Sequence, residues 1–344
     1  MPLSFINILS SILIFQLLLL VLFLLTSTKG KRLSNRILAF FFLWFAFNLI
    51  DGLLSYYGFY ERFPAWAHIE DGFILLVGPT LYFYTLSMVY KDFAFKKSHW
   101  LHLVPFLLVT ALFQLSYHLQ PEEYQKQIQS AIVRQELPLA FYFSISLIYA
   151  HVSVYLFLAF AELGRYRLRI KDQFSSIHRI NLNWLIFMLG SIAFILVVSI
   201  VYTFLPATGL RQFFEQSFFL PFLFILFFTN AVVWKGLKQP AIFSGIEYST
   251  EKEDRKYAGS QMAVEEMNQI RERLDRIVVE QKPWLDPDLR IDQLAGKTNT
   301  SAKKLSQVIH RSLQQNFFDF INTHRIEEAK KIMNTSQDPK LTVL

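Results

Sequence analysis

The chain has 344 residues and a formal net charge of +7; 53% of its residues are hydrophobic and 18% are charged. These averages combine two compositions, because about 12% of residues 1–234 are charged against about 31% of residues 235–344. Soluble domains are about 25% charged, so the first part is too apolar for a soluble fold and the second is typical of one. The split excludes both a single globular enzyme and a pure membrane protein. The lack of cysteine excludes disulfides, thiolate catalysis and cysteine-ligated zinc.

Seven stretches in the first part are long and apolar enough to cross a membrane, which takes roughly 20 mostly apolar residues. They are about Ile6–Thr26, Ile37–Leu54, Gly72–Tyr90, Leu101–Ser116, Pro138–Ala161, Trp184–Leu205 and Ser217–Trp234. We interpret the first as a retained span and not as a signal peptide, because its basic cluster follows the apolar run. The sequence therefore predicts a seven-helix transmembrane bundle over residues 1–234.

The positive charges between these spans predict the orientation of the bundle. Twelve Lys and Arg lie in the loops after the first, third and fifth spans, and four lie in the alternate loops. Positively charged loops stay in the cytoplasm. We therefore expect a multi-pass protein of the inner or plasma membrane, with its N-terminus outside and residues from 235 onward in the cytoplasm.

An aromatic and acidic segment follows the second span. It contains Tyr56, Tyr57, Phe59, Tyr60, Phe63, Trp66, His68, Glu70 and Asp71. Such a rim could bind an amphipathic external ligand, or its aromatic residues could form the belt found at membrane interfaces. Polar residues elsewhere in or near the spans are open to two interpretations, helix-packing hydrogen bonds or a pocket or proton path. The segment from Glu122 to Glu136 is predicted to be a short polar loop.

Residues 235–261 are predicted to form a cytoplasmic linker. Gln239-Pro240 prevents a continuing helix, and residues 248–260 are polar without an apolar period. The linker is followed by an amphipathic helix over residues 262–281, where apolar residues recur at spacings of three and four. Lys282-Pro283 ends this helix.

Residues 290–309 predict a short helix, a turn at Gly296–Thr300 and a second helix that Ser301 caps. This is the layout of a helix-turn-helix unit, in which the second helix enters the major groove of DNA. Lys and Gln side chains suit phosphate and base contacts, although a merely solvated helix face has the same pattern. The predicted DNA-binding residues are Ser301, Lys303, Lys304, Gln307 and Arg311.

A third helix is predicted from Asn316 onward, with Asn316 as its cap. Its predicted apolar face consists of Phe317, Phe320, Ile321, His324, Ala329 and Ile332. Residues 290–331 carry eight Lys or Arg and four Asp or Glu, a local net charge of +4 that is compatible with DNA binding.

The string IDQLAGKTNTSAKKLSQVIHRSLQQNFFDFINTHRIEEAKKIM resembles the first helix-turn-helix and the linking helix of the AraC-type transcription regulators. The features that match are Leu294-Ala295, Ser301 with Leu305, Phe317 with Phe320, and above all the string Arg325–Lys330. Seven spans before such a domain are similar to a known arrangement of membrane-bound AraC-like regulators. The resemblance implies two helix-turn-helix units that read adjacent segments of the major groove.

The chain departs from the family pattern in three places. The first is the second helix-turn-helix unit, of which only the entry, Asp338–Leu344, has a counterpart in the chain. Residues 262–344 are therefore expected to hold an incomplete DNA-binding domain that binds DNA weakly by itself. Gln314 stands where the family has Gly, which closes the helix in a left-handed conformation. Arg290 is a poor choice for a helix cap.

These features predict an all-α, membrane-bound transcription regulator that binds specific DNA sequences and uses its bundle as a sensor or anchor. The alternative is a membrane receptor whose helical tail docks a protein partner. No P-loop, zinc-protease or nucleophile-elbow motif occurs, so we expect neither an enzyme nor a cofactor or metal. The expected partners are DNA, membrane lipid and an unknown signal ligand or protein, with a homodimer possible.

Overall fold

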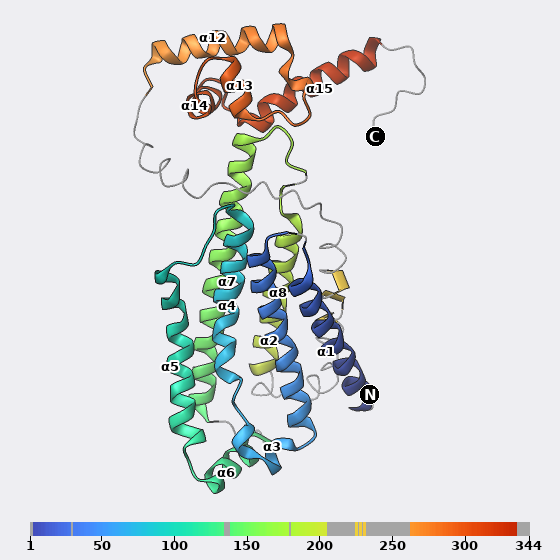
Figure 1. Ribbon diagram of the computed structural model, residues 1–344, viewed down its shortest axis with the longest axis vertical. Coiled ribbons are helices and arrows are strands. Elements are labelled where there is room, and N and C mark those ends of the chain that lie inside the picture. Colours follow the sequence, from blue (N-terminus) through green and yellow to red (C-terminus); the bar gives the residue numbers. More distant parts are fainter. Residues whose placement is uncertain are drawn as a thin grey trace. The chain divides into compact units, whose positions relative to one another are not determined.

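The computed structural model describes residues 3–28, 30–133, 138–178, 180–204, 224–225, 227–228, 230–231 and 262–335. All elements in these ranges are helical, and no strand occurs among them (Figure 1). The chain folds as two compact units. Unit 1 contains Met1–Leu163 and Leu182–Gly245, and unit 2 contains Gly164–Asn181 and Ile246–Leu344.

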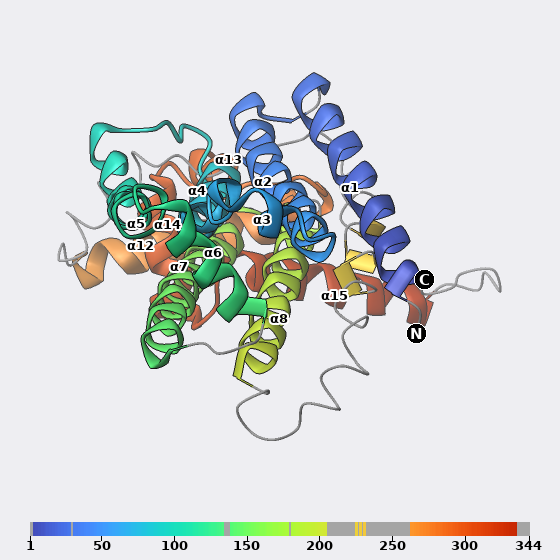
Figure 2. The same cartoon turned by 90° about the horizontal axis from the view of Figure 1, so that it is seen from below.

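The elements of unit 1 are long helices joined by short helical turns. In chain order they are α1 (Leu3–Thr26), α2 (Arg32–Tyr56), α3 (Phe59–Arg62), η1 (Pro64–Trp66), η2 (Asp71–Phe73), α4 (Ile74–Val89), η3 (Lys97–Leu103), α5 (Val104–Phe113), η4 (Gln114–His118), α6 (Glu122–Val133), the first part of α7 (Leu139–Gln173) and α8 (Asn183–Phe204). The long helices lie side by side, with α1 next to α2 at the edge of the unit (Figure 2).

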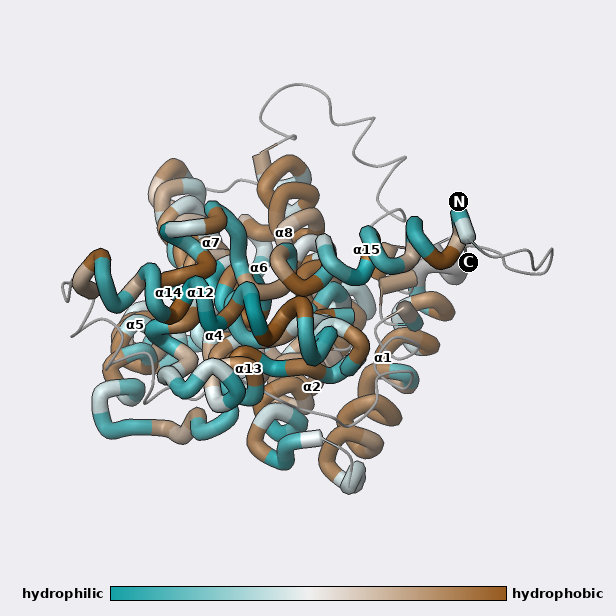
Figure 3. Tube along the Cα trace, turned by 90° about the horizontal axis from the view of Figure 1, so that it is seen from above, coloured by the Kyte–Doolittle hydropathy of each residue, from teal (hydrophilic) through white to brown (hydrophobic). Residues whose placement is uncertain are grey.

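Six helical segments of the described chain are long and apolar enough to cross a membrane. They are Asn7–Thr26, Arg32–Tyr56, Pro64–Val89, Lys97–His118, Leu139–Gln173 and Asn183–Phe204. Each overlaps one of the first six predicted spans, and the seventh, Ser217–Trp234, lies mostly outside the described residues. Helices α1 and α8 are apolar over most of their length, whereas α12, α14 and α15 of unit 2 alternate between polar and apolar residues (Figure 3).

Helix α4 is the most enclosed helix of unit 1, and it packs against α2 and α5. Gly78 permits a close approach between α4 and α7, because a Cβ atom at this position would lie 2.9 Å from Cβ of Tyr155. Lys31 closes the far end of α4 by donating from Nζ to the carbonyl oxygens of Ser87 (3.0 Å) and Tyr90 (2.6 Å). Helix-end carbonyls need such donors. Burial lowers the pKa of Lys31 to about 8.

Most of the polar side chains in or near the spans have hydrogen-bond partners. Tyr90 donates to the Glu162 carboxylate at 3.1 Å, and Nδ1 of His102 lies 2.5 Å from the Tyr155 hydroxyl. His151 is one of the exceptions, since both of its ring nitrogens are buried without a partner in the described chain. Helix packing therefore accounts for most of these groups.

Two segments that follow predicted spans are helical where the sequence predicted loops. The segment after the fourth span is mainly the helix α6, in which Gln125 is buried and donates to the carbonyl oxygens of Tyr117 (3.2 Å) and Gln120 (3.1 Å). The helix of the fifth predicted span does not end near Ala161, because α7 continues through the charged residues that follow to Gln173. In both places, side-chain contacts and helical hydrogen bonds stabilise a helix where high polarity predicted a loop.

Unit 2 contains the end of α7, followed by the elements α12 (Val264–Gln281), η6 (Pro283–Leu285), α13 (Ile291–Lys297), α14 (Ala302–Leu313) and α15 (Phe317–Thr335). Helix α12 ends directly before Lys282-Pro283, as predicted. Ser301 caps the start of α14, which is also as predicted. The third helix is capped as predicted, since the Asn316 side chain accepts from the Asp319 amide at 2.8 Å. The linker 235–261 and the segment Asp338–Leu344 lie outside the described residues.

Gln314 ends α14 in the left-handed conformation that its place in the sequence predicts, with φ 55° and ψ 33°. A side chain is disfavoured in this region, whereas Gly is not. We expect Gln314→Gly to stabilise unit 2 by about 0.5–1 kcal/mol, measured by hydrogen exchange of the α14 amides. Gln315→Gly is the matched control and should destabilise the unit, because φ is not positive there. Equal effects of the two substitutions would contradict this assignment.

Candidate nucleic-acid interface

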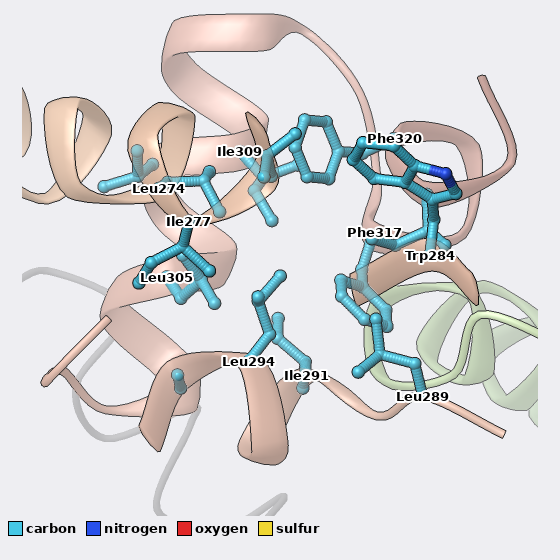
Figure 4. Close-up of a cluster of buried hydrophobic side chains, with 14 of the residues drawn as sticks. Leu274, Ile277, Trp284, Leu289, Ile291, Leu294, Leu305, Ile309, Phe317 and Phe320 are labelled. Carbon is cyan, nitrogen blue, oxygen red and sulfur yellow. The ribbon is translucent and has the colours of Figure 1, made fainter. Parts of the chain in front are cut away.

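The candidate interface rests on a single hydrophobic core in unit 2. The core is formed by α12, α13, α14, α15 and the turn η6, and its buried side chains point toward one another (Figure 4). Helix α14 contributes Leu305, Val308 and Ile309, each 0% exposed. Close packing of this kind leaves a helix little freedom to rotate about its own axis. The opposite face of α14 is thereby held outward.

The connection between α13 and α14 is a tight four-residue turn, Thr298–Ser301. The buried Thr298 hydroxyl donates to the carbonyl oxygen of Leu294 at 3.2 Å, and the Thr300 amide donates to that of Ala295 at 2.9 Å. Asn299 has φ 51°, a left-handed conformation that Asn tolerates better than most side chains. These contacts fix α14 relative to α13.

The predicted DNA-binding side chains lie on one side of α14. At 3.6 residues per turn, positions 303, 304, 307 and 311 fall within an arc of roughly 100°. The buried Leu305, Val308 and Ile309 occupy the opposite arc. Lys303, Lys304 and Arg311 are exposed, and Gln307 is half-buried. The structure therefore brings together four of the five predicted residues on one exposed surface, which we call the α14 polar face.

Ser301, the fifth residue, has a structural contact of its own. Its hydroxyl oxygen accepts from the Lys304 amide at 3.3 Å and so caps the first turn of α14. Lys304 is also engaged, since its Nζ lies 2.5 Å from Glu266 Oε1 on α12. Both side chains of this ion pair are well exposed, so the pair contributes about 0–1 kcal/mol. A phosphate group could replace Glu266 at little cost.

A contact that the sequence did not predict joins the loop after α7 to α15. The Arg325 guanidinium donates to the Ser175 carbonyl oxygen (3.0 Å), the Ser175 hydroxyl (2.9 Å), the Trp284 carbonyl (2.8 Å) and the Asp286 carbonyl (2.6 Å). Asn322 donates to the same Ser175 carbonyl at 3.1 Å. We call this set of hydrogen bonds the Arg325 clamp. It makes the segment Gly164–Asn181 a part of unit 2.

Three further contacts lie around the Arg325 clamp. The Ser175 amide donates to the Leu289 carbonyl at 3.1 Å, directly before α13. The Arg290 guanidinium lies 5.1 Å from the centre of the Phe174 ring. His310 Nε2, on α14, lies 2.9 Å from Asp172 Oδ1 near the end of α7. The end of α7 and the loop after it thus contact the start of α13 and the end of α14.

His324 belongs to the aromatic part of the core. Its ring stacks on Trp284 at a centroid distance of 5.0 Å and meets the edge of Phe320 at 5.0 Å. Burial lowers the pKa of His324, and the charge of Asp275 opposes that shift. The neutral ring therefore serves packing, as its place on the predicted apolar face indicated.

The predicted apolar face of α15 is correct only for its first half. Phe317, Phe320 and Ile321 are buried, whereas Ala329 and Ile332 are exposed. The core of unit 2 covers the first turns of α15 and does not reach its last turns. Helical periodicity identifies an apolar face, but it does not show how far along the helix a partner extends.

Comparison with known proteins gives no relative for this chain. No protein-family model matches it, and neither a curated protein nor a solved structure is significantly similar to it. The described residues also contain no group of His, Asp and Glu that could hold a metal ion. The function must therefore be inferred from the geometry of the chain itself.

Proposed function

We propose that the protein is a membrane-bound transcription regulator that binds DNA through α13, α14 and the turn between them. The observation that carries this proposal is the α14 polar face, where Lys303, Lys304, Gln307 and Arg311 lie opposite the buried side of the helix. A capped helix held by its core and exposed along a basic arc fits the major groove. The resemblance of residues 291–333 to AraC-type regulators points in the same direction.

Each side chain of the α14 polar face has a distinct expected role. Lys303, Lys304 and Arg311 would contact phosphates, which supply most of the affinity and no sequence information. Gln307 would contact a base edge, since its amide can pair with adenine in the major groove. Ser301 would act mainly as the cap that orients Lys303 and Lys304.

The membrane part of the proposal is a seven-span bundle with its N-terminus outside and unit 2 in the cytoplasm. The six apolar helical segments and the twelve-to-four distribution of basic residues between the loops support it. Helix α7 contributes residues to both units. A shift at the end of α7 would reach α13 through the Ser175–Leu289 hydrogen bond and α14 through the contact between Asp172 and His310, which gives a proposed route for a signal.

DNA binding by the full chain in detergent tests the proposal. We expect weak binding to a duplex of about 30 base pairs, with an affinity that falls steeply between about 50 and 200 mM salt. Lys303→Ala should reduce the slope of log K against log salt by about one, because one phosphate contact is lost. Gln307→Ala should leave the slope unchanged and alter the preference among sequences.

Lys331→Ala is the matched control for this experiment, since Lys331 is an exposed lysine on α15. It should leave both the affinity and the slope unchanged. Fluorescence anisotropy at several salt concentrations measures all of these variants. If Lys303→Ala and Gln307→Ala bind as the unchanged chain does, α14 is not the DNA-contacting helix.

A second candidate function, docking of a protein partner by the same helices, is favoured by the end of α15. Ile326, Ile332 and Met333 are each about half exposed there. Exposed apolar side chains that cluster on one element are common at protein interfaces. The two functions differ in what the α14 polar face touches, and this difference can be measured directly.

A further inference from the structure

A cavity of about 420 Å³ lies in unit 1 between α2 and the segment from α3 to η2. This volume is within the range of small-molecule sites, roughly 300–1,000 Å³. Six aromatic side chains line it, namely Phe40, Trp44, Phe47, Tyr60, Trp66 and Phe73. Part of the aromatic segment after the second predicted span therefore forms one wall of a cavity, and α2 forms the other wall.

The described lining of this cavity contains two carboxyl groups and no Lys, Arg or His side chain. Asp51, on α2, and Glu70, before η2, are the only ionisable residues of the described lining apart from Tyr60. Asp51 accepts a short hydrogen bond from the Tyr60 hydroxyl, and Glu70 Oε1 accepts from Asn48 Nδ2 at 3.2 Å.

One carboxylate oxygen of Glu70, which lines the cavity, has no hydrogen-bond donor among the described residues. This atom, Oε2, is buried. A buried carboxylate oxygen without a donor is unfavourable, and a ligand that supplies a donor and a positive charge removes that cost. The neighbouring Asp71 does not compete for such a ligand, since His68 Nδ1 lies 2.7 Å from its Oδ2.

We propose that this cavity binds a small organic cation, an amine with an apolar body. The ammonium group would contact Glu70 and Asp51, and the apolar body would pack against the aromatic walls, whose ring faces also attract cations. A zwitterionic lipid headgroup fits less well, because its phosphate would approach the same two carboxylates. The site would give the bundle a ligand to sense, and it does not depend on whether unit 2 binds DNA.

A series of three probes of equal shape tests the charge requirement on the full chain in phosphatidylcholine nanodiscs. The probes are 4-phenylbutylamine, 4-phenylbutanol and 4-phenylbutanoate, which are cationic, neutral and anionic at neutral pH. Saturable binding is measured by equilibrium dialysis against empty nanodiscs, which corrects for partition into lipid. We expect the amine to bind at least about tenfold more tightly than the alcohol, as a hydrogen bond to a charged group implies, and the acid not to bind.

Variants locate the binding site. Glu70→Gln keeps the shape of the side chain and should weaken amine binding by about tenfold, and Asp51→Asn should act in the same direction. Trp66→Ala, in the exposed part of the wall, should weaken all apolar probes alike. Glu123→Gln is the matched control, since Glu123 is an exposed carboxylate of α6 outside the cavity lining.

Two results would overturn the proposal. Equal binding of the amine, the alcohol and the acid would show a cavity that selects only for apolar surface. No saturable amine binding above that of empty nanodiscs would show that the cavity is filled by lipid or takes no cation. Because the probe series uses the unchanged chain, both results can be read even if a variant fails to fold.

Discussion

Replacement of Arg325 by alanine is expected to destabilise unit 2 by about 2–3 kcal/mol, because hydrogen bonds to a charged group contribute about 1.5–3 kcal/mol each and are not additive. The substitution removes the four hydrogen bonds to Ser175, Trp284 and Asp286 that form the Arg325 clamp. Three carbonyl oxygens would lose their charged donor. Arg325→Lys should recover little of this, since an ammonium group cannot reach all of these acceptors at once.

Hydrogen exchange of the full chain measures this loss of stability. The amides around Ser175 and around Trp284 should exchange faster in Arg325→Ala, while those of α1 and α2 should not change. Arg276→Ala is the like-for-like control, because Arg276 is exposed on α12. Unchanged exchange at Ser175 in Arg325→Ala would contradict the coupling between the loop after α7 and the rest of unit 2.

Leu305→Ala is expected to destabilise unit 2 by about 2–5 kcal/mol, the usual range for a fully buried leucine. Leu305 is 0% exposed and belongs to the hydrophobic core of unit 2 (Figure 4). The cavity left behind would loosen α14, so exchange protection of α14 and DNA binding should be lost together. A loss of that size is a large part of the stability of a small domain.

Leucine to alanine at an exposed position is the control, because it removes the same atoms without removing buried contacts. Leu285 is 66% exposed, and Leu285→Ala should change the stability by less than about 0.5 kcal/mol. Exchange protection and the salt-dependent affinity are measured on both variants. If Leu305→Ala and Leu285→Ala behave alike, α14 is not held by the core as described.

The sequence predicted well whatever depends on neighbouring residues. Hydropathy over about 20 residues located the six described apolar segments. The period of 3.6 residues located α12 and α14, and capping chemistry located Ser301 and Asn316 as helix starts. The left-handed Gln314 was expected from the resemblance, since the family has Gly at this position. Residues that are near in the sequence determine the helices and their caps.

Features that depend on distant residues were not predictable. The Arg325 clamp joins positions 150 residues apart, and no local pattern links Arg325 to Ser175. Helix α6 was predicted as a loop because part of its packing is with distant residues, such as the contact of Gln129 Nε2 with His68 Nε2 at 2.9 Å. The acidic and aromatic segment after the second span was predicted as one possible ligand-binding rim, but the opposite wall of the cavity on α2 was not predicted. The exposed Ile332 shows the same limit, since periodicity does not reveal the extent of a core.

Photo-crosslinking from the α14 polar face shows directly whether this face touches DNA. A photoreactive amino acid is placed at position 303, 307 or 331 of the full chain, which is then irradiated in its native host. We expect covalent DNA adducts from positions 303 and 307, enriched in particular genomic fragments, and none above background from position 331. Adducts to protein alone from positions 303 and 307 would contradict this expectation and would favour a docking surface for a protein partner.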